Sequence, residues 1–549
     1  MKNHTSDHYR RALQHFIQSM IVAAFTPALI FGITIGTSCA GSGTWILNPI
    51  NDDWNTAANW SSDTVPGPLD EATFGVSNQT DISVSAPASV GGITFNAGAD
   101  AYQITAPPSQ SLGIEGTGID NESGIVQNFV AAVDDAGNAG VLGFDTHATA
   151  GGLTVFTTEA RTVVGGNTGL VQFVDLASGG SATIINNGGI VSGAGGGETD
   201  VVNSSTLDMA NITNKAGVVS GASGGVTSFF LESPSAGDSV ITCEGATVSG
   251  AAGGTTIFHG DSRGANATLI ANGGANGGTG GSIRFEDSSK GTAGQVKLFG
   301  DGSLDISAHA GQPVTIGSLE GDGEVFLGAR TLTVGGNSLS TTFSGIIQDG
   351  GLGGGVGGSL SKIGTGTLRL TGGNTYTGGT TLTKGALIVK NKTGSATGTG
   401  PVQVNLGTLQ GIGKISGAVT VGTGTTSGAI LLAGNNATSP GILTINNTLT
   451  FNSLSTYQCV LNRTKGKAST LTALGVTINS NVPFTFTDTG TGTLTAGTIF
   501  KVINNTSANP IFGTFSNLPD GSTFASNGNN FQVSYEGGTG NDLTLTVVP

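Results

Sequence analysis

The sequence predicts an all-β protein, specifically a right-handed parallel β-helix of about 28 residues per coil with an N-terminal cap and a β-rich C-terminal cap. Two observations indicate this fold class. Short β-patterned runs alternate with glycine-rich turns along the 549 residues, of which 95 are glycine. Large apolar side chains also recur at a regular interval. Because one winding cannot bury its own apolar face, such a repeat requires stacked neighbours.

Composition excludes several alternatives. Only 24 Phe, 5 Tyr and 3 Trp are too few for several compact globular cores, and the alternating apolar runs argue against disorder. The chain is sparsely charged, with 20 basic against 35 acidic residues and a net charge of −15. No basic stripe is expected, so neither nucleic acid nor an anionic membrane is predicted as a partner.

Residues 1–40 are predicted to be a signal peptide. Three basic residues precede an apolar run, 20–35, which is too short for a comfortable membrane span. Small residues place the cleavage site near Ala40, and the alternative is a lipoprotein acylated at Cys39. No transmembrane segment is expected in the mature chain. The two later cysteines, Cys243 and Cys459, lie far apart and are predicted to be buried, unpaired thiols.

Residues 41–141 are expected to form the N-terminal cap and the first coils. All three tryptophans fall within sixteen residues, at Trp45, Trp54 and Trp60. They could form a platform on which sugars stack, since flat apolar rings suit sugar faces. The favoured interpretation is a cap whose bulky side chains close the open end of the solenoid core.

Residues 142–350 are predicted to be regular β-helix repeats. Six apolar anchors are spaced 29, 28, 29, 28 and 27 residues apart: Phe144, Phe173, Val201, Phe230, Phe258 and Phe285. A second apolar point follows each anchor, and a third recurs at 190–191, 218–219 and 247–248, which predicts a three-sided coil. The phenylalanines are expected to stack inside the coil; an exposed aromatic binding stripe is the alternative.

Residues 351–448 are predicted to continue the β-helix. Within 360–391, three β-patterned runs are separated by glycine breaks. The passage resembles the autotransporter-associated β-strand repeat, or passenger-associated repeat, family. The resemblance rests on Lys362, Gly364, Gly366-Thr367-Leu368, Leu370-Thr371-Gly372, Asn374-Thr375-Tyr376-Thr377-Gly378-Gly379-Thr380 and Gly385. It implies a bacterial protein of the cell envelope, secreted or on the outer surface, with an adhesin-like role.

Residues 449–549 are expected to form the C-terminal β-rich cap. The 28-residue period is lost there, and phenylalanines become denser. Antiparallel β-structure at this end would blunt the last exposed edge of the solenoid.

The sequence contains few motifs that indicate a catalytic or binding site. Two G-x-S-x-G matches, at 221–225 and 260–264, and one G-x-G-x-x-G match, at 411–417, lack the helix that each motif requires. A calcium-type sequence at 537–542 occurs once, whereas such sites need adjacent turns. His259 beside Asp261 is the nearest approach to a catalytic grouping. No catalytic, cofactor-binding or metal-binding residue is therefore predicted, and no cofactor.

The sequence favours a non-enzymatic role. We expect a secreted or cell-surface structural or adhesive β-helix that displays an extended surface to extracellular polysaccharide or cell-surface components. The alternative is a polysaccharide lyase or glycoside hydrolase on the same scaffold. An enzyme of that kind would bring two acidic groups, or an acid and a Lys or Arg, within about 5–10 Å in an open groove.

Overall fold

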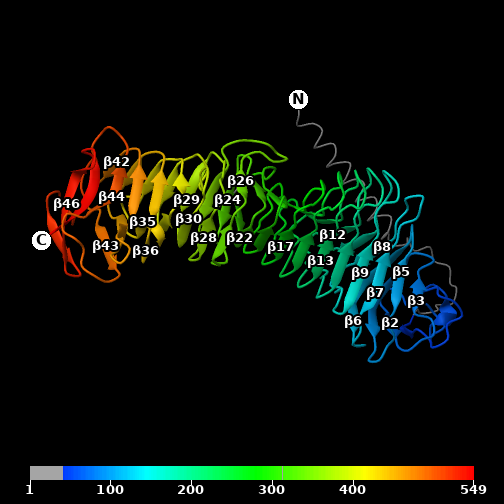
Figure 1. Cartoon of the computed structure of the whole chain (residues 1–549). Helices are drawn as coiled ribbons and strands as arrows, with labels where there is room; N and C mark the ends of the chain where they lie inside the picture. Colours follow the sequence, from blue (N-terminus) through cyan, green and yellow to red (C-terminus); the bar gives the residue numbers. More distant parts are fainter. Residues whose placement is uncertain (1–40, 312) are drawn as a thin grey trace. The chain divides into compact units, whose positions relative to one another are not determined.

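The structure is a computed structural model that describes residues 41–311 and 313–549. The predicted signal peptide lies outside the described residues. In the described part, the chain is all-β apart from one short 3-10 helix, η1 (Ala57–Asn59), and no helix there is long and apolar enough to cross a membrane. Successive coils stack through parallel strand pairing (Figure 1). The prediction of a parallel β-helix is confirmed.

The first sheet contains thirteen strands in parallel register. Their order is β1 (Gly43–Thr44), β2 (Glu71–Phe74), β4 (Ala88–Phe95), β6 (Ser111–Asn121), β8 (Val141–Phe144), β10 (Leu170–Phe173), β12 (Glu198–Val202), β14 (Val226–Phe230), β16 (Thr255–Phe258), β18 (Ser282–Phe285), β20 (Ser303–Asp305), β23 (Glu324–Phe326) and β26 (Ile346–Gln348).

The second sheet runs beside the first and continues further toward the C-terminus. Its parallel strands are β3 (Asp81–Ser83), β5 (Gln103–Ala106), β7 (Gln127–Ala131), β9 (Thr154–Thr158), β11 (Thr183–Asn186), β13 (Asn211–Asn214), β15 (Val240–Cys243), β17 (Thr268–Ala271), β19 (Gln295–Leu298), β22 (Ser318–Gly321), β25 (Thr341–Phe343), β28 (Thr367–Leu370), β30 (Ala386–Val389), β32 (Gly407–Gly411), β35 (Ala429–Asn436), β39 (Thr456–Asn462) and β43 (Phe484–Thr489). Two short strands pair with it in antiparallel fashion, β36 (Ser439–Pro440) and β40 (Lys467–Ala468).

A third sheet begins only at residue 314 and is again parallel. It comprises β21 (Val314–Ile316), β24 (Thr331–Val334), β27 (Ser359–Lys362), β29 (Gly379–Leu382), β31 (Val402–Val404), β34 (Val419–Val421), β38 (Leu449–Phe451) and β42 (Val476–Ile478).

The fourth sheet lies at the C-terminal end and changes direction. Parallel pairing continues through β33 (Lys414–Ile415), β37 (Ile442–Ile445), β41 (Thr470–Ala473) and β44 (Ile499–Asn505). Antiparallel strands then complete it: β47 (Asp542–Val548), β46 (Asn529–Gly537) and β45 (Thr523–Ser526).

The phenylalanine anchors stack inside the helix, as predicted, with one correction. Ring centroids lie 5.0 Å apart for Phe144 and Phe173, and 4.6 Å apart for Phe258 and Phe285. The partner of Phe258 is Phe229, at 4.4 Å, and not Phe230. Choosing Phe230 as the anchor was wrong because two phenylalanines are adjacent, and a slip of one residue along a strand changes the face.

The predicted third apolar point is wrong for the coils before residue 314. Ile190 and Val218 are 50% and 56% exposed. This side is a glycine turn rather than a strand, and backbone bonds join it to the next coil, from the Gly193 amide to the Gly221 carbonyl at 2.9 Å. Gly193 and Gly221 have φ of 78° and 80°, a left-handed conformation that only glycine adopts without cost. The aliphatic side chains before the turn therefore point outward.

The three tryptophans are buried in the first coils. Trp60 packs edge-on against Trp45 at 5.2 Å and against Trp54 at 5.0 Å, and Phe74 continues the cluster toward the next coil. Each tryptophan is at most 1% exposed. The interpretation as a sugar-stacking platform is therefore wrong, because no ring face is available to a ligand.

A buried polar ladder, which the sequence did not suggest, runs along one corner. Thr158 donates to Asn186 at 2.8 Å, and Asn186 donates to Asn214 at 2.7 Å. Asn214 then approaches the Cys243 thiol at 3.8 Å. Cys243 is a free, buried thiol, as is Cys459, which confirms the prediction for both.

Candidate functional site

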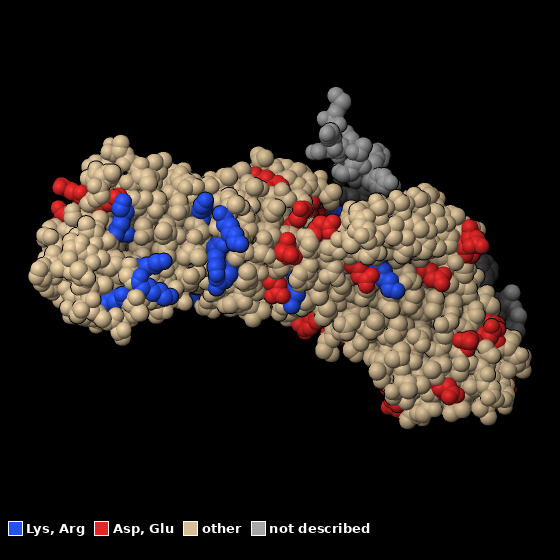
Figure 2. All heavy atoms as spheres, in the orientation of Figure 1, with Lys and Arg blue, Asp and Glu red and all other residues tan. Residues whose placement is uncertain are grey.

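Positive charge is concentrated in one part of the chain. Residues 350–487 contain nine basic residues and no acidic one, whereas residues 41–349 contain 30 acidic and 7 basic residues. Lys and Arg accordingly predominate on one part of the displayed face, and Asp and Glu on another (Figure 2). The nine are Lys362, Arg369, Lys384, Lys390, Lys392, Lys414, Arg463, Lys465 and Lys467. The expectation of no basic stripe is wrong for this segment, because it relied on the average over the whole chain.

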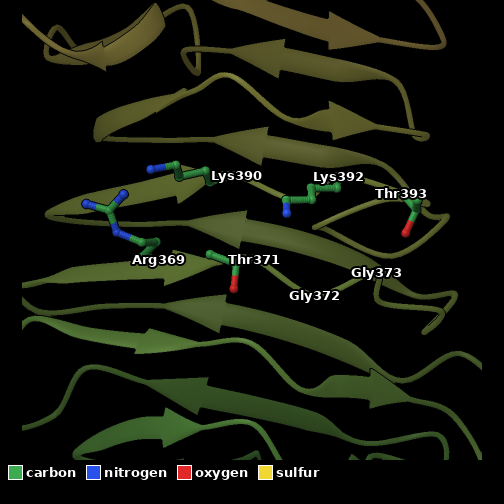
Figure 3. Close-up of a pocket in the computed structure, with 7 residues that line it drawn as sticks. All are labelled: Arg369, Thr371, Gly372, Gly373, Lys390, Lys392 and Thr393. Atoms are coloured by element: carbon green, nitrogen blue, oxygen red, sulfur yellow. The ribbon is translucent and has the colours of Figure 1, made fainter.

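Three of these cations surround a hollow at the carboxyl ends of β28 and β30. The hollow has a volume of about 620 Å³. Figure 3 shows Arg369, Lys390 and Lys392 on the same side of the strands, beside Gly372 and Gly373. The lining residues are Arg369, Thr371, Gly372, Gly373, Lys390, Lys392 and Thr393. Two neighbouring coils therefore build one cationic site.

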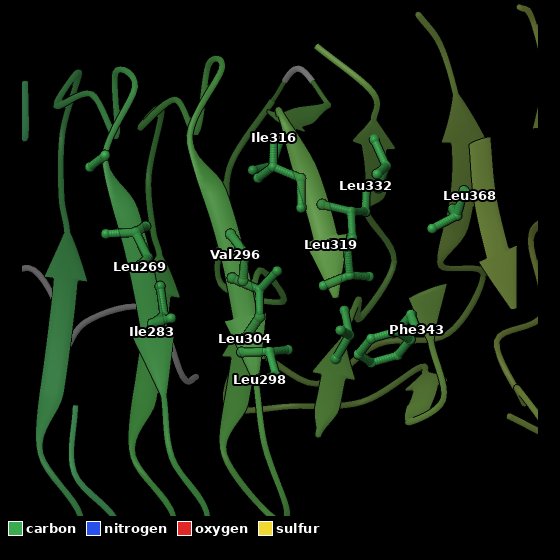
Figure 4. Packing of buried hydrophobic residues seen from close by; sticks show 14 of the residues in the cluster. Leu269, Ile283, Val296, Leu298, Leu304, Ile316, Leu319, Leu332, Phe343 and Leu368 are labelled. Atoms are coloured by element: carbon green, nitrogen blue, oxygen red, sulfur yellow. The ribbon is translucent and has the colours of Figure 1, made fainter. Parts of the chain in front are cut away.

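Strand alternation aims Arg369 outward. Leu368 and Leu370 on either side of it are buried, whereas Arg369 is partly exposed. Leu368 pairs with Leu387 of the next coil and belongs to the same buried cluster as Phe343 (Figure 4). The apolar residues of β28 thus fix the strand, and its outward position is left for the guanidinium group.

A buried asparagine shapes the turn that carries the two lysines. Asn391 is 5% exposed, and its amide donates to the carbonyl oxygens of Thr393 at 3.1 Å and Gly394 at 3.0 Å. Its side-chain oxygen accepts the Lys414 amide of the next coil at 2.8 Å. Since Asn391 points inward, its neighbours Lys390 and Lys392 are exposed.

The cations of the hollow are not neutralised within the described residues. There, ion pairs involve Lys297 with Glu320, Arg463 with Asp488, Lys501 with Asp542, and His259 with two carboxylates, but none involves Arg369, Lys390 or Lys392. The positive charge therefore faces solvent and is available to an anion.

Two polar side chains that carry the family resemblance, Lys362 and Tyr376, stabilise the coil, whereas Thr371 and Gly372 of the same motif line the hollow. Lys362 is buried, and its Nζ donates to the carbonyl oxygens of Ile363, Gly364 and Lys384. Burial lowers the pKa of Lys362 to about 8. The Tyr376 hydroxyl bonds with that of Thr380 in the core. These polar groups hold the turns of successive coils together.

The histidine grouping noted in the sequence gains carboxylate neighbours. His259 Nδ1 lies 3.5 Å from Glu286 and 3.8 Å from Asp287. Asp261 and His309 line a smaller hollow of about 320 Å³. His309 is buried, which lowers its pKa, and its Nε2 lies 2.8 Å from the Ser289 carbonyl oxygen. Among the described residues, no group of three or more His, Cys, Asp or Glu side chains could hold a metal ion.

The short motif matches lie in turns and strand ends of the β-structure. Ser262 of the 260–264 match is buried in a turn between β16 and β17, where a substrate cannot reach it. The 411–417 match spans the end of β32 and the short strand β33. Asp542 of the calcium-type tail forms an ion pair with Lys501 at 2.7 Å. None of these segments is followed by a helix in the described chain.

A pair of carboxyl groups on β12 is the nearest match to the arrangement expected of an enzyme. Glu198 and Asp200 lie two residues apart, so both face the same side of the first sheet, with their Cα atoms about 6.6 Å apart. Burial raises the pKa of both, while the charge of Arg161 opposes this effect on Glu198. Oδ1 of Asp200 is buried and lacks a hydrogen-bond partner among the described residues.

Comparison with known proteins supports the resemblance seen in the sequence. Residues 360–389 match the family model described as Passenger-associated-transport-repeat. No curated protein matches the chain. The crystal structure of the Haemophilus influenzae Hap adhesin is similar at 9% identity and a TM-score of 0.25, and the match covers 88% of this chain and 64% of that one.

The fold and the matched segment together define a parallel β-helix protein that carries a passenger-associated transport repeat. The matched residues supply β27, β28, β29 and β30, so the repeat provides strands of the second and third sheets. The cationic hollow is built partly from this repeat and partly from the turn that follows it.

Proposed function

We propose that the protein is a secreted or cell-surface β-helix that makes adhesive contacts with extracellular polysaccharide or cell-surface components. The presence of a passenger-associated transport repeat in a continuous stack of coils supports this proposal. The single observation that carries it is the unpaired cationic hollow of Arg369, Lys390 and Lys392. A surface of this kind binds anions without needing a catalytic group.

The location is tested by protease treatment of intact cells that produce the full chain. The expected result is that the chain is found in the medium, or is digested on intact cells while a cytoplasmic control protein survives. Protection of the chain until the cells are lysed would contradict the proposal.

Contact is tested by applying the purified chain to a glycan array and to whole cells. Saturable binding to at least one polysaccharide or cell surface is expected, and heat-unfolded protein should not show it. Absence of saturable binding on both surfaces would overturn the adhesive role.

A polysaccharide lyase or glycoside hydrolase is the second candidate, and the Glu198 and Asp200 pair favours it. A carboxyl group with a raised pKa beside a second carboxyl group suits general acid catalysis. Its test is the release of reducing ends or unsaturated sugars from a polysaccharide panel. Activity that is lost in Glu198→Gln and Asp200→Asn would support the enzymatic function. Absence of sugar release by the wild-type chain would exclude it.

A further inference from the structure

We propose that the hollow binds one linear acidic polysaccharide, whose chain lies along the axis on which the coils stack. This inference rests on the proposed contact function and names its ligand class. The carboxylate or sulfate groups of the polymer would pair with Arg369, Lys390 and Lys392.

The arrangement of the cations indicates a polymer rather than a small anion. Arg369 lies on β28, and Lys390 and Lys392 follow β30 in the next coil. Lys414 belongs to the coil after that, where its amide bonds to the side chain of Asn391. Successive coils rise by about 4.8 Å. Three successive coils therefore each carry a partly or fully exposed cation, offset from one another along the strand direction. A ligand with repeated negative charges can contact several of them together.

The acidic residues of 41–349 do not neutralise the positive potential at the hollow. On the second sheet, the residue in register with Arg369 in the preceding coil is Thr342, and Glu320 lies one coil before Thr342. Glu320 is engaged by Lys297 at 3.2 Å. At physiological ionic strength, charges are screened over about 8 Å. The local cations therefore determine the potential at the hollow, although the whole chain is acidic.

The lining favours an acidic glycan over a neutral glycan or a single-stranded nucleic acid. Neutral sugars and unstacked bases both bind by stacking on aromatic rings, and the hollow is lined only by Arg, Lys, Thr and Gly. The Thr371 and Thr393 hydroxyls suit hydrogen bonds to sugar hydroxyls. At Gly372 an added Cβ would clash with the Gly345 carbonyl oxygen, so this glycine lets the preceding coil pack closely beside the hollow.

The surrounding coils hold the site in place before the ligand arrives. The Thr371 amide donates to the Phe343 carbonyl at 3.0 Å, and the Lys390 amide donates to the Leu370 carbonyl at 2.9 Å. Backbone bonds between coils thus fix the spacing of the cations. Binding then requires no rearrangement of the backbone, which favours affinity.

The experiment measures binding of the full chain to a polyuronate, to a neutral glucan of equal length, and to single-stranded DNA. The test variant is Arg369→Gln/Lys390→Gln/Lys392→Gln. The matched control, Lys215→Gln/Arg263→Gln/Lys290→Gln, removes the same three charges from the acidic part of the chain. Circular dichroism and thermal melting establish that both variants are folded.

The expected result is salt-sensitive binding of the polyuronate, weakened at least tenfold in the test variant and less than twofold in the control. Short oligouronates should bind more weakly than the polymer, because they span fewer coils. Equal binding by the test variant and wild type would overturn the inference, as would equal binding of the neutral glucan or tighter binding of DNA. Binding to cells or to the glycan array that persists in the test variant would leave the contact function standing and remove only this site.

Discussion

The Asn186 side-chain amide donates to the side-chain oxygen of Asn214 over 2.7 Å, with both residues fully buried. The two asparagines occupy equivalent positions on β11 and β13, in register. A Thr227 hydroxyl also donates to Asn214 at 2.9 Å. Each coil thus supplies a hydrogen-bond partner for the buried asparagine of its neighbour. This hydrogen bond favours the observed register of β11 and β13.

Replacing Asn214 by Leu is expected to destabilise the protein strongly. The change removes the acceptor of the buried Thr227 hydroxyl, at a cost of about 1–3 kcal/mol for that group. It also removes one acceptor of the Asn186 amide, which still donates to the Val226 carbonyl oxygen at 3.0 Å. Urea unfolding measures the loss. Asn211→Leu on the exposed face of the same strand is the control, with an expected change below about 0.5 kcal/mol. Equal stability of the two variants would contradict the ladder.

Phe258→Ala is expected to lower the free energy of unfolding by about 3–5 kcal/mol. The ring stacks on Phe229 at 4.4 Å and on Phe285 at 4.6 Å, so its removal opens a cavity between two coils. Phe299→Ala is the matched control, since that ring is 41% exposed. A loss for Phe258→Ala no larger than for Phe299→Ala would show that the column is not packed as described.

Lys362 should make stability depend on pH in the alkaline range. Its folded pKa of about 8 lies below the ordinary lysine value of 10.5, so between these pH values the unfolded chain binds a proton that the folded chain does not. Stability contributed by this residue therefore rises as pH increases from about 8 to 10.5. The difference in unfolding free energy between wild type and Lys362→Met, measured across this range, should follow that direction. A flat difference would contradict the lowered pKa.

The two cysteines should be unreactive in the folded protein. Burial raises the pKa of Cys243 to about 11 and that of Cys459 to about 12, so neither thiolate forms near neutral pH. Alkylation at pH 8 followed by peptide mapping should leave both unmodified, whereas alkylation in denaturant should modify both. Labelling of either thiol under native conditions would contradict its burial.

The fold could be predicted because its period is visible in the chain. Phe144, Phe173 and Val201 are paired in register on neighbouring strands, so the spacing between successive anchors in the sequence equals the length of one coil. Adjacent residues of equal type could not be separated in this way, which explains the error of one position at Phe230. The prediction for the glycine side was wrong because its apolar residues, such as Val218, lie in an exposed turn and not on a strand that faces the core.

The candidate site could be predicted only in part. A window of the sequence from 350 to 487 would have revealed basic residues without acidic ones, but the average over the chain concealed this. The hollow itself depends on the pairing of β28 with β30, which places Arg369 of one coil near Lys390 of the next. Strand register across coils is needed to bring together residues about twenty positions apart.

Lysine footprinting shows where on the chain a polyuronate binds. The full chain is acetylated with and without a polyuronate, and the modification of each lysine is measured by mass spectrometry. Lys390 and Lys392 should become protected, while Lys215 and Lys290 should not change. Protection of Lys215 and Lys290 alone, or no protection of Lys390 and Lys392 at a saturating polymer concentration, would contradict binding at the hollow.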